Sequence, residues 1–253
     1  MIQDGGVVGG TGGSLTKIGS GKLVLSHRNT YTGGTIIKRG KLIVNNIGDS
    51  GTGTGPVQVE GGELGGKGTI AGAVTVGTGF GSGAVLAPGY VHGVGSPGTL
   101  TIQGLLTFNG DGIYEVQVNS STMMADEVAV LGVVINAGAQ FDFADIGNGT
   151  LPIGTAFTII NNTSATPIAG TFSNLPDGST FSTNGNAYQV SYEGRDGNDL
   201  TLTVVPWAVR HARRAVLSSS WLWKRVGEVA EGNRKIKVDH AARHTMLDRC
   251  LFA

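Results

Sequence analysis

The sequence predicts an all-β protein whose strands share one core by winding as a solenoid. Between Leu15 and Val44, short runs of alternating apolar residues recur, and a glycine precedes each run. Glycine accounts for 44 of the 253 residues, without the strict Gly-X-Y period of collagen. Charged residues make up 14% of the chain and apolar residues 40%. This composition suits short strands, tight corners that need positive φ, and a continuous narrow core.

The first element is a pair of glycine-opened strands, GKLVL at residues 21–25 and GKLIV at residues 40–44, with GTII at residues 34–37 between them. Side chains alternate faces along a strand, so each of the two outer runs places a pair of aliphatic side chains on one side. Strands this short cannot each build a core. They bury a shared core when successive turns of chain stack on one another, which predicts a solenoid.

The same stretch resembles the autotransporter-associated β-strand repeat of bacterial surface and passenger proteins. The matching features are NTYTGGT at residues 29–35, the two flanking G-x-L-x-[LV] runs, and Leu15, Lys17 and Gly19 ahead of them. The resemblance covers residues 15–44. It implies a right-handed parallel β-helix displayed outside the cell, and it implies no particular reaction.

The β-helix is expected to occupy residues 1–110. A turn-rich connector, NNIGDSGTGTG at residues 45–55, follows the opening repeat. Further short apolar runs continue the pattern at residues 57–59, 62–64, 99–102 and 106–108. Residues 87–102 read APGYVHGVGSPGTLTI, with two Pro-Gly turns. This passage is similar to the SPG(x)SPGTLTI passage that ends the repeats of family members.

Residues 111–205 are expected to form a second, β-rich C-terminal module. Longer strands are predicted at residues 113–118, 127–135, 139–143, 156–161, 187–193 and 199–205. Most of the Phe residues fall here, as expected where longer strands enclose a wider core. The run RDGN at residues 195–198 predicts a hairpin turn, because Asp-Gly and Asn tolerate positive φ. A terminal hairpin would cover the open end of the solenoid.

Residues 206–253 differ in composition from the rest of the chain. They hold all three Trp, the single Cys (Cys250), and ten Lys and Arg against four Asp and Glu. Three interpretations stay open: a frameshifted reading of a lost sorting signal, which the abrupt break favours; a basic interfacial helix with Val209, Val216 and Trp223 on one side; and unspecified disorder.

Charge and targeting signals limit the partners and the location. The formal net charge is zero, which argues against nucleic acid or an anionic membrane as a general partner. No run of about 18 uncharged apolar residues is present to span a bilayer. The N-terminus MIQDGGVVGG lacks the basic and apolar regions of a signal peptide. We therefore expect a fragment or a misplaced start codon, and membrane attachment only through an anchor outside this chain.

Two motifs bear a superficial likeness to functional sites. Residues 48–51 read GDSG, the string around the nucleophile of chymotrypsin-like proteases. Only His27 precedes it, and a serine nucleophile needs both a base and an orienting acid, so a Gly/Ser turn is the preferred interpretation. Residues 196–199 (DGND) carry oxygen ligands that suit a hard cation, but the string occurs once, so a hairpin turn is preferred.

The remaining charged candidates favour solvated surface. Asp142 and Asp145 are conceivable as an acid–base pair, yet Asp142 alternates with two Phe residues and so is expected on a solvent face. The pair Asp126–Glu127 at a strand start is expected to be a solvated edge. His92 has no companion at metal-ligand spacing. Lys38, Arg39 and Lys41 form a small basic patch that suits an anionic glycan, although solvation is the simpler interpretation.

We therefore expect no catalytic, cofactor-binding or metal-binding residues, and no cofactor. The expected function is that of a non-catalytic passenger, secreted or exposed at the surface of a bacterium, acting as a rigid stalk or an adhesion surface. Its expected partners are host or environmental glycans or surface proteins. The alternative is a β-helix enzyme acting on polysaccharide as a lyase or glycosidase, which needs carboxylates gathered about 5–10 Å apart along one groove.

Overall fold

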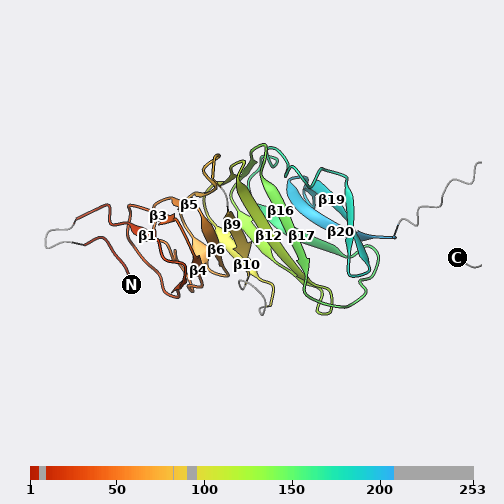
Figure 1. Cartoon of the computed structure of the whole chain (residues 1–253), viewed down its shortest axis with the longest axis horizontal. Helices are drawn as coiled ribbons and strands as arrows, with labels where there is room; N and C mark the ends of the chain where they lie inside the picture. The colour runs from red at the N-terminus through yellow and green to blue at the C-terminus, as the bar shows by residue number, and fades with distance from the viewer. Residues whose placement is uncertain (6–9, 82, 90–95, 208–253) are drawn as a thin grey trace, which may run out of the picture. The chain divides into compact units, whose positions relative to one another are not determined.

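A computed structural model describes residues 1–5, 10–81, 83–89 and 96–207 (Figure 1). These residues contain twenty strands and no helix, so the predicted all-β class is confirmed. The chain from Met1 to Ala208 forms one compact unit. Its strands belong to three sheets, which we call sheets A, B and C.

Sheet A contains six strands, and every neighbouring pair in it is parallel. In spatial order they are β1 (Leu15–Lys17), β3 (Thr35–Ile37), β5 (Val57–Val59), β8 (Val74–Val76), β11 (Leu106–Phe108) and β15 (Val133–Ile135). Each strand is only three residues long, as the short glycine-bounded runs predict.

Sheet B is also parallel along most of its width. Its strands are β2 (Lys22–Leu25), β4 (Lys41–Val44), β6 (Gly62–Gly66), β9 (Ala84–Pro88), β12 (Gly112–Asn119) and β16 (Gln140–Asp145), with the short β13 (Met124–Ala125) antiparallel to β12. In Figure 1, β4, β6, β9 and β12 follow one another as neighbours, in chain order.

Sheet C changes from parallel to antiparallel pairing at β17. Its parallel strands are β7 (Thr69–Ile70), β10 (Thr99–Ile102), β14 (Glu127–Val130) and β17 (Ala156–Asn162). The antiparallel part consists of β20 (Asp199–Val205), β19 (Asn186–Gly194) and β18 (Thr180–Thr183). Of the predicted longer strands, the one at residues 199–205 has the predicted bounds.

From β5 to β17, apart from the short β13, the chain visits sheets A, B and C in rotation. We call the stretch from one strand of sheet A to the next a pass. The register partners along sheet A are Leu15, Thr35, Val57, Val74, Leu106 and Val133. The differences between these residue numbers give pass lengths of 20, 22, 17, 32 and 27 residues. Parallel strands need a long crossover connection, and here strands of the other two sheets supply it.

The core lies inside the sheets as columns of stacked side chains. One column runs along sheet B through Leu23, Leu42, Leu64, Leu86, Tyr114 and Phe141. All but Leu23, which is partly buried, are almost fully shielded from solvent. The aliphatic column becomes aromatic where the passes lengthen, because a wider core needs larger side chains to reach native packing density.

Glycines allow adjacent passes to approach at their corners. Gly40 and Gly62 both have φ of +75° and occupy equivalent positions before β4 and at the start of β6. A Cβ atom on Gly62 would overlap the carbonyl oxygen of Gly40, and a Cβ on Gly40 would overlap that of Gly19. The corner glycines of the repeat are therefore required by both conformation and space.

Two sequence-based expectations need comment. The single strand predicted at residues 127–135 is wrong, because Gly132 with φ of +91° turns the corner between β14 in sheet C and β15 in sheet A. The division expected at residue 110 does not interrupt the sheets, since parallel pairing continues through β15, β16 and β17. The division into a β-helix repeat region at residues 1–110 and a C-terminal β-module at residues 111–205 stays a prediction, and residues 208–253 lie outside the described chain.

The terminal hairpin predicted at residues 195–198 is confirmed. β19 and β20 pair antiparallel, with Gly194 opposite Asp199. Gly197 has a φ of 101°, as the Asp-Gly pair predicts, whereas the other positive φ of the turn, 51°, is at Arg195 and not at Asp196 or Asn198.

Candidate functional site

Charged side chains on the first passes pair with opposite charges one pass away. Lys41 Nζ lies 2.8 Å from Glu63 Oε2, and these residues are register partners on β4 and β6. Lys38 Nζ lies 3.8 Å from a carboxylate oxygen of Glu60. Two members of the basic patch predicted at Lys38, Arg39 and Lys41 therefore face carboxylates of the following pass, which reduces the local positive charge available to an anionic glycan.

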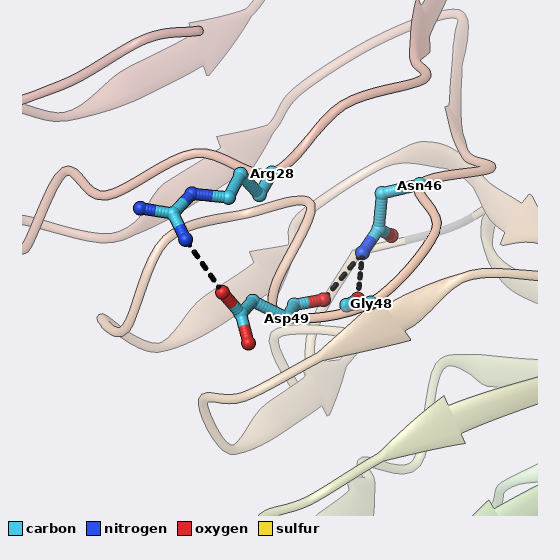
Figure 2. A network of polar contacts seen from close by, with 4 residues as sticks. All are labelled: Arg28, Asn46, Gly48 and Asp49. Carbon is cyan, nitrogen blue, oxygen red and sulfur yellow. Dashed lines mark hydrogen bonds and ion pairs between the residues drawn. The ribbon is translucent and has the colours of Figure 1, made fainter.

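The GDSG string at residues 48–51 forms a tight turn (Figure 2). Asn46 Nδ2 donates to the carbonyl oxygens of Gly48, at 2.7 Å, and of Asp49, and Gly48 has φ of +75°. The Asp49 carboxylate points away from this turn toward Arg28 of the preceding pass, at 2.9 Å. Both side chains are largely exposed, so this ion pair contributes at most about 1 kcal/mol.

Ser50 is bound to the backbone on two passes. Its Oγ accepts hydrogen bonds from the backbone N–H of Thr52, at 3.2 Å, and of Ala71, at 3.1 Å. Ser50 is only 6% exposed. His27 Nδ1 contacts the neighbouring Ser26 Oγ at 3.1 Å. In this arrangement the Ser50 hydroxyl holds the turn against the next pass.

The DGND string at residues 196–199 lies in the β19–β20 hairpin. Asp199 Oδ1 accepts a hydrogen bond from the Asn162 backbone N–H at 2.8 Å, while Oδ2 lies 3.6 Å from Arg195 Nε. Burial raises the pKa of Asp199 above its ordinary value, against the lowering effect of the Asn162 hydrogen bond. Within the described ranges, no group of three or more His, Cys, Asp or Glu side chains could hold a metal ion.

Asp126 corrects a sequence-based expectation. It was expected at a solvated edge, but it is only 2% exposed. Its two carboxylate oxygens accept hydrogen bonds from the backbone N–H of Gly98 and of Gln117, both at 3.0 Å. Burial raises the pKa of Asp126 to about 7. The expectation failed because two inward-pointing backbone donors needed an acceptor, which the residue pattern does not reveal.

Asp142 and Asp145 also bind backbone donors close to β16. Asp142 is exposed, as expected, and its Oδ1 accepts a hydrogen bond from Phe143 N at 2.9 Å. Asp145 Oδ1 accepts hydrogen bonds from Ser120 N at 3.1 Å and from Gly147 N at 2.9 Å. Each carboxylate thus accepts hydrogen bonds from backbone N–H groups, and the bond from Ser120 to Asp145 joins segments 25 residues apart in sequence.

Asp111 organises an exposed loop between β8 and β9. Its carboxylate accepts hydrogen bonds from the backbone N–H of Thr78, Gly79 and Gly81, at 3.1, 2.6 and 2.9 Å. Although burial acts to raise it, these bonds hold the pKa of Asp111 below its ordinary value. The loop carries Phe80, whose side chain is 99% exposed.

Sequence reasoning missed an aromatic cleft, which we call the β16–β18 cleft. It has a volume of about 270 Å³ and is lined chiefly by Phe141, Phe143, Leu175, Pro176 and Phe181. The rings of Phe143 and Phe181 meet edge to face with centroids 5.0 Å apart. The alternation of Phe141 and Phe143 in QFDFAD was the available signal, but Phe181 lies about forty residues further along the chain and nothing in the pattern connects it.

The other predicted features fall outside the described residues. These are His92, Cys250, and the basic segment apart from its first residues, Pro206 and Trp207. Of the three Trp residues, Trp207 is described and is 57% exposed.

Comparison with protein families identifies a short matching stretch near the N-terminus. Residues 15–44 match the family described as the passenger-associated transport repeat. This stretch of 30 residues begins at the first residue of β1 and ends at the last residue of β4. No curated protein matches the chain. Within the matched stretch, β1 pairs in parallel with β3 and β2 pairs in parallel with β4.

A search of the described residues for membrane-spanning helices found none.

Proposed function

We propose that the protein is a non-catalytic passenger of the autotransporter type, secreted or exposed at a bacterial surface. In this proposal its three sheets form a right-handed parallel β-helix that acts as a rigid stalk or an adhesion surface. The passenger repeat at residues 15–44 supports the surface location. The parallel register between Leu15 and Thr35 and between Lys22 and Lys41 supports winding of the repeat as stacked passes.

The observation that carries the non-catalytic part is the use of the carboxylates. Asp111, Asp126, Asp145 and Asp199 each accept hydrogen bonds from backbone N–H groups that lie 25 or more residues away in sequence. A carboxylate bound in this way bridges two passes and satisfies donors that β-ladders leave unpaired at the corners. The acidic residues of this weakly charged chain therefore support a structural role.

A polysaccharide lyase or glycosidase remains the untested alternative. Its acid and base would have to reach a substrate from one groove. The carboxyl of Asp126, whose pKa burial raises to about 7, is buried and bound to two backbone donors, which supports the structural interpretation instead.

Surface location is testable by antibody labelling of intact and permeabilised cells that produce the protein from its own gene. The expected result is equal labelling in both, while a cytoplasmic control protein is labelled only after permeabilisation. Labelling of this protein only after permeabilisation would contradict the proposal. Release of reducing or unsaturated ends from acidic or neutral polysaccharides by the purified protein would favour the enzyme instead.

A further inference from the structure

The β16–β18 cleft lies between two strand edges that no described strand covers. β16 is the last strand on its side of sheet B and pairs only with β12 among the described strands. β18 is the last strand of sheet C and pairs only with β19. An uncovered strand edge presents backbone N–H and C=O groups that can pair with another extended chain.

The outward-facing residues of β16 can be identified from its hydrogen bonds. Ile146 N, just past the strand, donates to Val118 O of β12, so by alternation the even-numbered residues face β12 and the odd-numbered residues face away. Side-chain amides cap two of these outward positions. Asn174 Oδ1 accepts from Phe141 N and Asn174 Nδ2 donates to Phe141 O, both at 2.8 Å.

The second cap closes the other end of the same edge. Asn184 Nδ2 donates to the carbonyl oxygen of Asp145 at 3.0 Å. Phe143 is the outward-facing residue between the two capped positions, Phe141 and Asp145. Its N–H donates to Asp142 Oδ1 at 2.9 Å, so the group that it offers at this edge is its carbonyl oxygen. Three residues separate the two capped positions, which lie about 13 Å apart at the usual rise of a strand.

The edge of β18 supplies a second set of backbone groups. Val190 N of β19 donates to Ser179 O at 2.9 Å, so by alternation Thr180 directs its backbone groups away from β19. Thr180 also lines the cleft. A bound chain could therefore pair with Thr180 on one side and approach Phe143 on the other.

The walls between the two edges are apolar. Phe143 and Phe181 are both partly exposed and pack against Tyr188, with ring centroids 5.3 Å from it in each case. Their exposed faces form an apolar surface on which an aliphatic side chain can be buried away from water. Apolar walls and unpaired backbone edges are the two features by which proteins bind extended peptides as an added strand.

We propose that the β16–β18 cleft binds a short extended segment of a partner polypeptide, two to four residues long, with at least one aliphatic side chain. The segment pairs its backbone with Thr180 and places the aliphatic side chain against Phe143 and Phe181. A peptide fits better than a sugar or a lipid, because only a peptide supplies alternating N–H and C=O groups to a strand edge. This site is independent of the proposed export and does not require that the protein be a passenger.

The test is a titration of the ¹⁵N-labelled full chain with the capped peptide acetyl-Thr-Val-Thr-Val-amide, followed by amide chemical shifts. The peptide is added up to about 10 mM, which covers millimolar dissociation constants. The amide chemical shifts of Thr180 and Phe143 are expected to change with peptide concentration until they reach a plateau. Absence of saturable shifts, or shifts confined to other regions, would overturn the proposal.

Two matched variants separate backbone pairing from apolar contact. Thr180→Pro removes the outward N–H at the first residue of an edge strand, where proline is tolerated. Thr180→Ala removes only the side chain. The proline variant should bind the peptide about tenfold more weakly than the parent, because a carbonyl oxygen of the bound peptide loses the N–H donor of residue 180. The alanine variant should bind the peptide with the affinity of the parent. Equal affinity of all three proteins would overturn the proposal.

A modified peptide gives the same information without changing the protein. Methylation of alternate peptide nitrogens removes backbone donors and keeps every side chain. If the methylated peptide binds as tightly as its parent, or if cellobiose displaces the peptide, the cleft is a simple apolar or glycan site and the proposal is wrong. If Thr180→Pro fails to fold, the methylated peptide decides.

Discussion

Truncation of a single side chain in the stacked column of sheet B tests whether the passes share one core. Leu64 on β6 is fully buried and lies in register between Leu42 of the preceding pass and Leu86 of the next. Leu64→Ala removes three side-chain carbon atoms from this column and leaves a cavity whose walls are fixed by the parallel ladders. Substitutions of this kind destabilise by 2–5 kcal/mol, and a value of about 3 kcal/mol is expected here.

This loss of stability should be visible in thermal unfolding of the purified chain. For a protein of this size, 1 kcal/mol corresponds to about 2–4 °C, so the Leu64→Ala midpoint should fall by roughly 6–12 °C. The matched control is Leu131→Ala, because Leu131 lies at a corner and is 53% exposed. The control should change stability by about 0.5 kcal/mol or less. Equal midpoints for the two variants would refute the shared column.

Three further predictions follow from the corners and edges. Gly62→Ala should lower the free energy of unfolding by well over 1 kcal/mol, because the new Cβ would overlap the carbonyl oxygen of Gly40 and the φ of Gly62 is +75°. The control Gly21→Ala should be nearly neutral, because the space around Gly21 is free. Denaturant unfolding of both variants checks this. The side-chain carboxyl carbon of Asp126 should titrate by NMR with a midpoint near 7. The same carboxyl titrates near 3.8 in the unfolded chain, so its contribution to the free energy of unfolding is fully present at low pH. Up to about 4 kcal/mol of this contribution is lost as the pH rises from 4 through 7. A titration midpoint below 4 in the folded protein would contradict this. Asn174→Ala removes both hydrogen bonds that cap the backbone of Phe141. Denaturant unfolding should show a loss of about 1–3 kcal/mol in the free energy of unfolding, and the uncapped edge should increase self-association of the chain. Unchanged stability would show that solvent replaces the cap.

Local sequence was sufficient to predict the parts of the fold that repeat. The runs at residues 21–25 and 40–44 became β2 and β4 in direct register, and Gly40, which opens the second run, lies at a close corner. The RDGN turn was predictable because Gly197 supplies positive φ locally, although the second positive φ is at Arg195 and not at Asp196 or Asn198 as the pattern suggested.

The errors arose where tertiary contacts outweighed local pattern. Residues 127–135 read as one apolar strand, and only the corner at Gly132 assigns their two halves to different sheets. Asp126 resembled a solvated charge, although backbone donors from Gly98 and Gln117 hold it inside. Neither donor is adjacent to Asp126 in sequence, so no window along the chain contains the information.

The β16–β18 cleft was inaccessible to sequence reasoning for a related reason. Phe141 and Phe143 come from sheet B, whereas Phe181 comes from sheet C. The cleft exists because both sheets end there with an uncovered edge, which depends on the change from parallel to antiparallel pairing at β17. Residue patterns predict strands, but they do not predict which strand will be last in its sheet.

Disulfide cross-linking between passes tests the parallel winding most directly. Gln58 on β5 and Thr75 on β8 are register partners, and adjacent strands lie about 5 Å apart, within reach of a disulfide. Thr107 on β11 is the next partner along the sheet, about 10 Å from Gln58. With Cys250→Ala as background, Gln58→Cys/Thr75→Cys should oxidise to an intramolecular disulfide, and Gln58→Cys/Thr107→Cys should stay reduced. Cross-linking of the second pair but not the first would contradict the order and register of the parallel strands in sheet A.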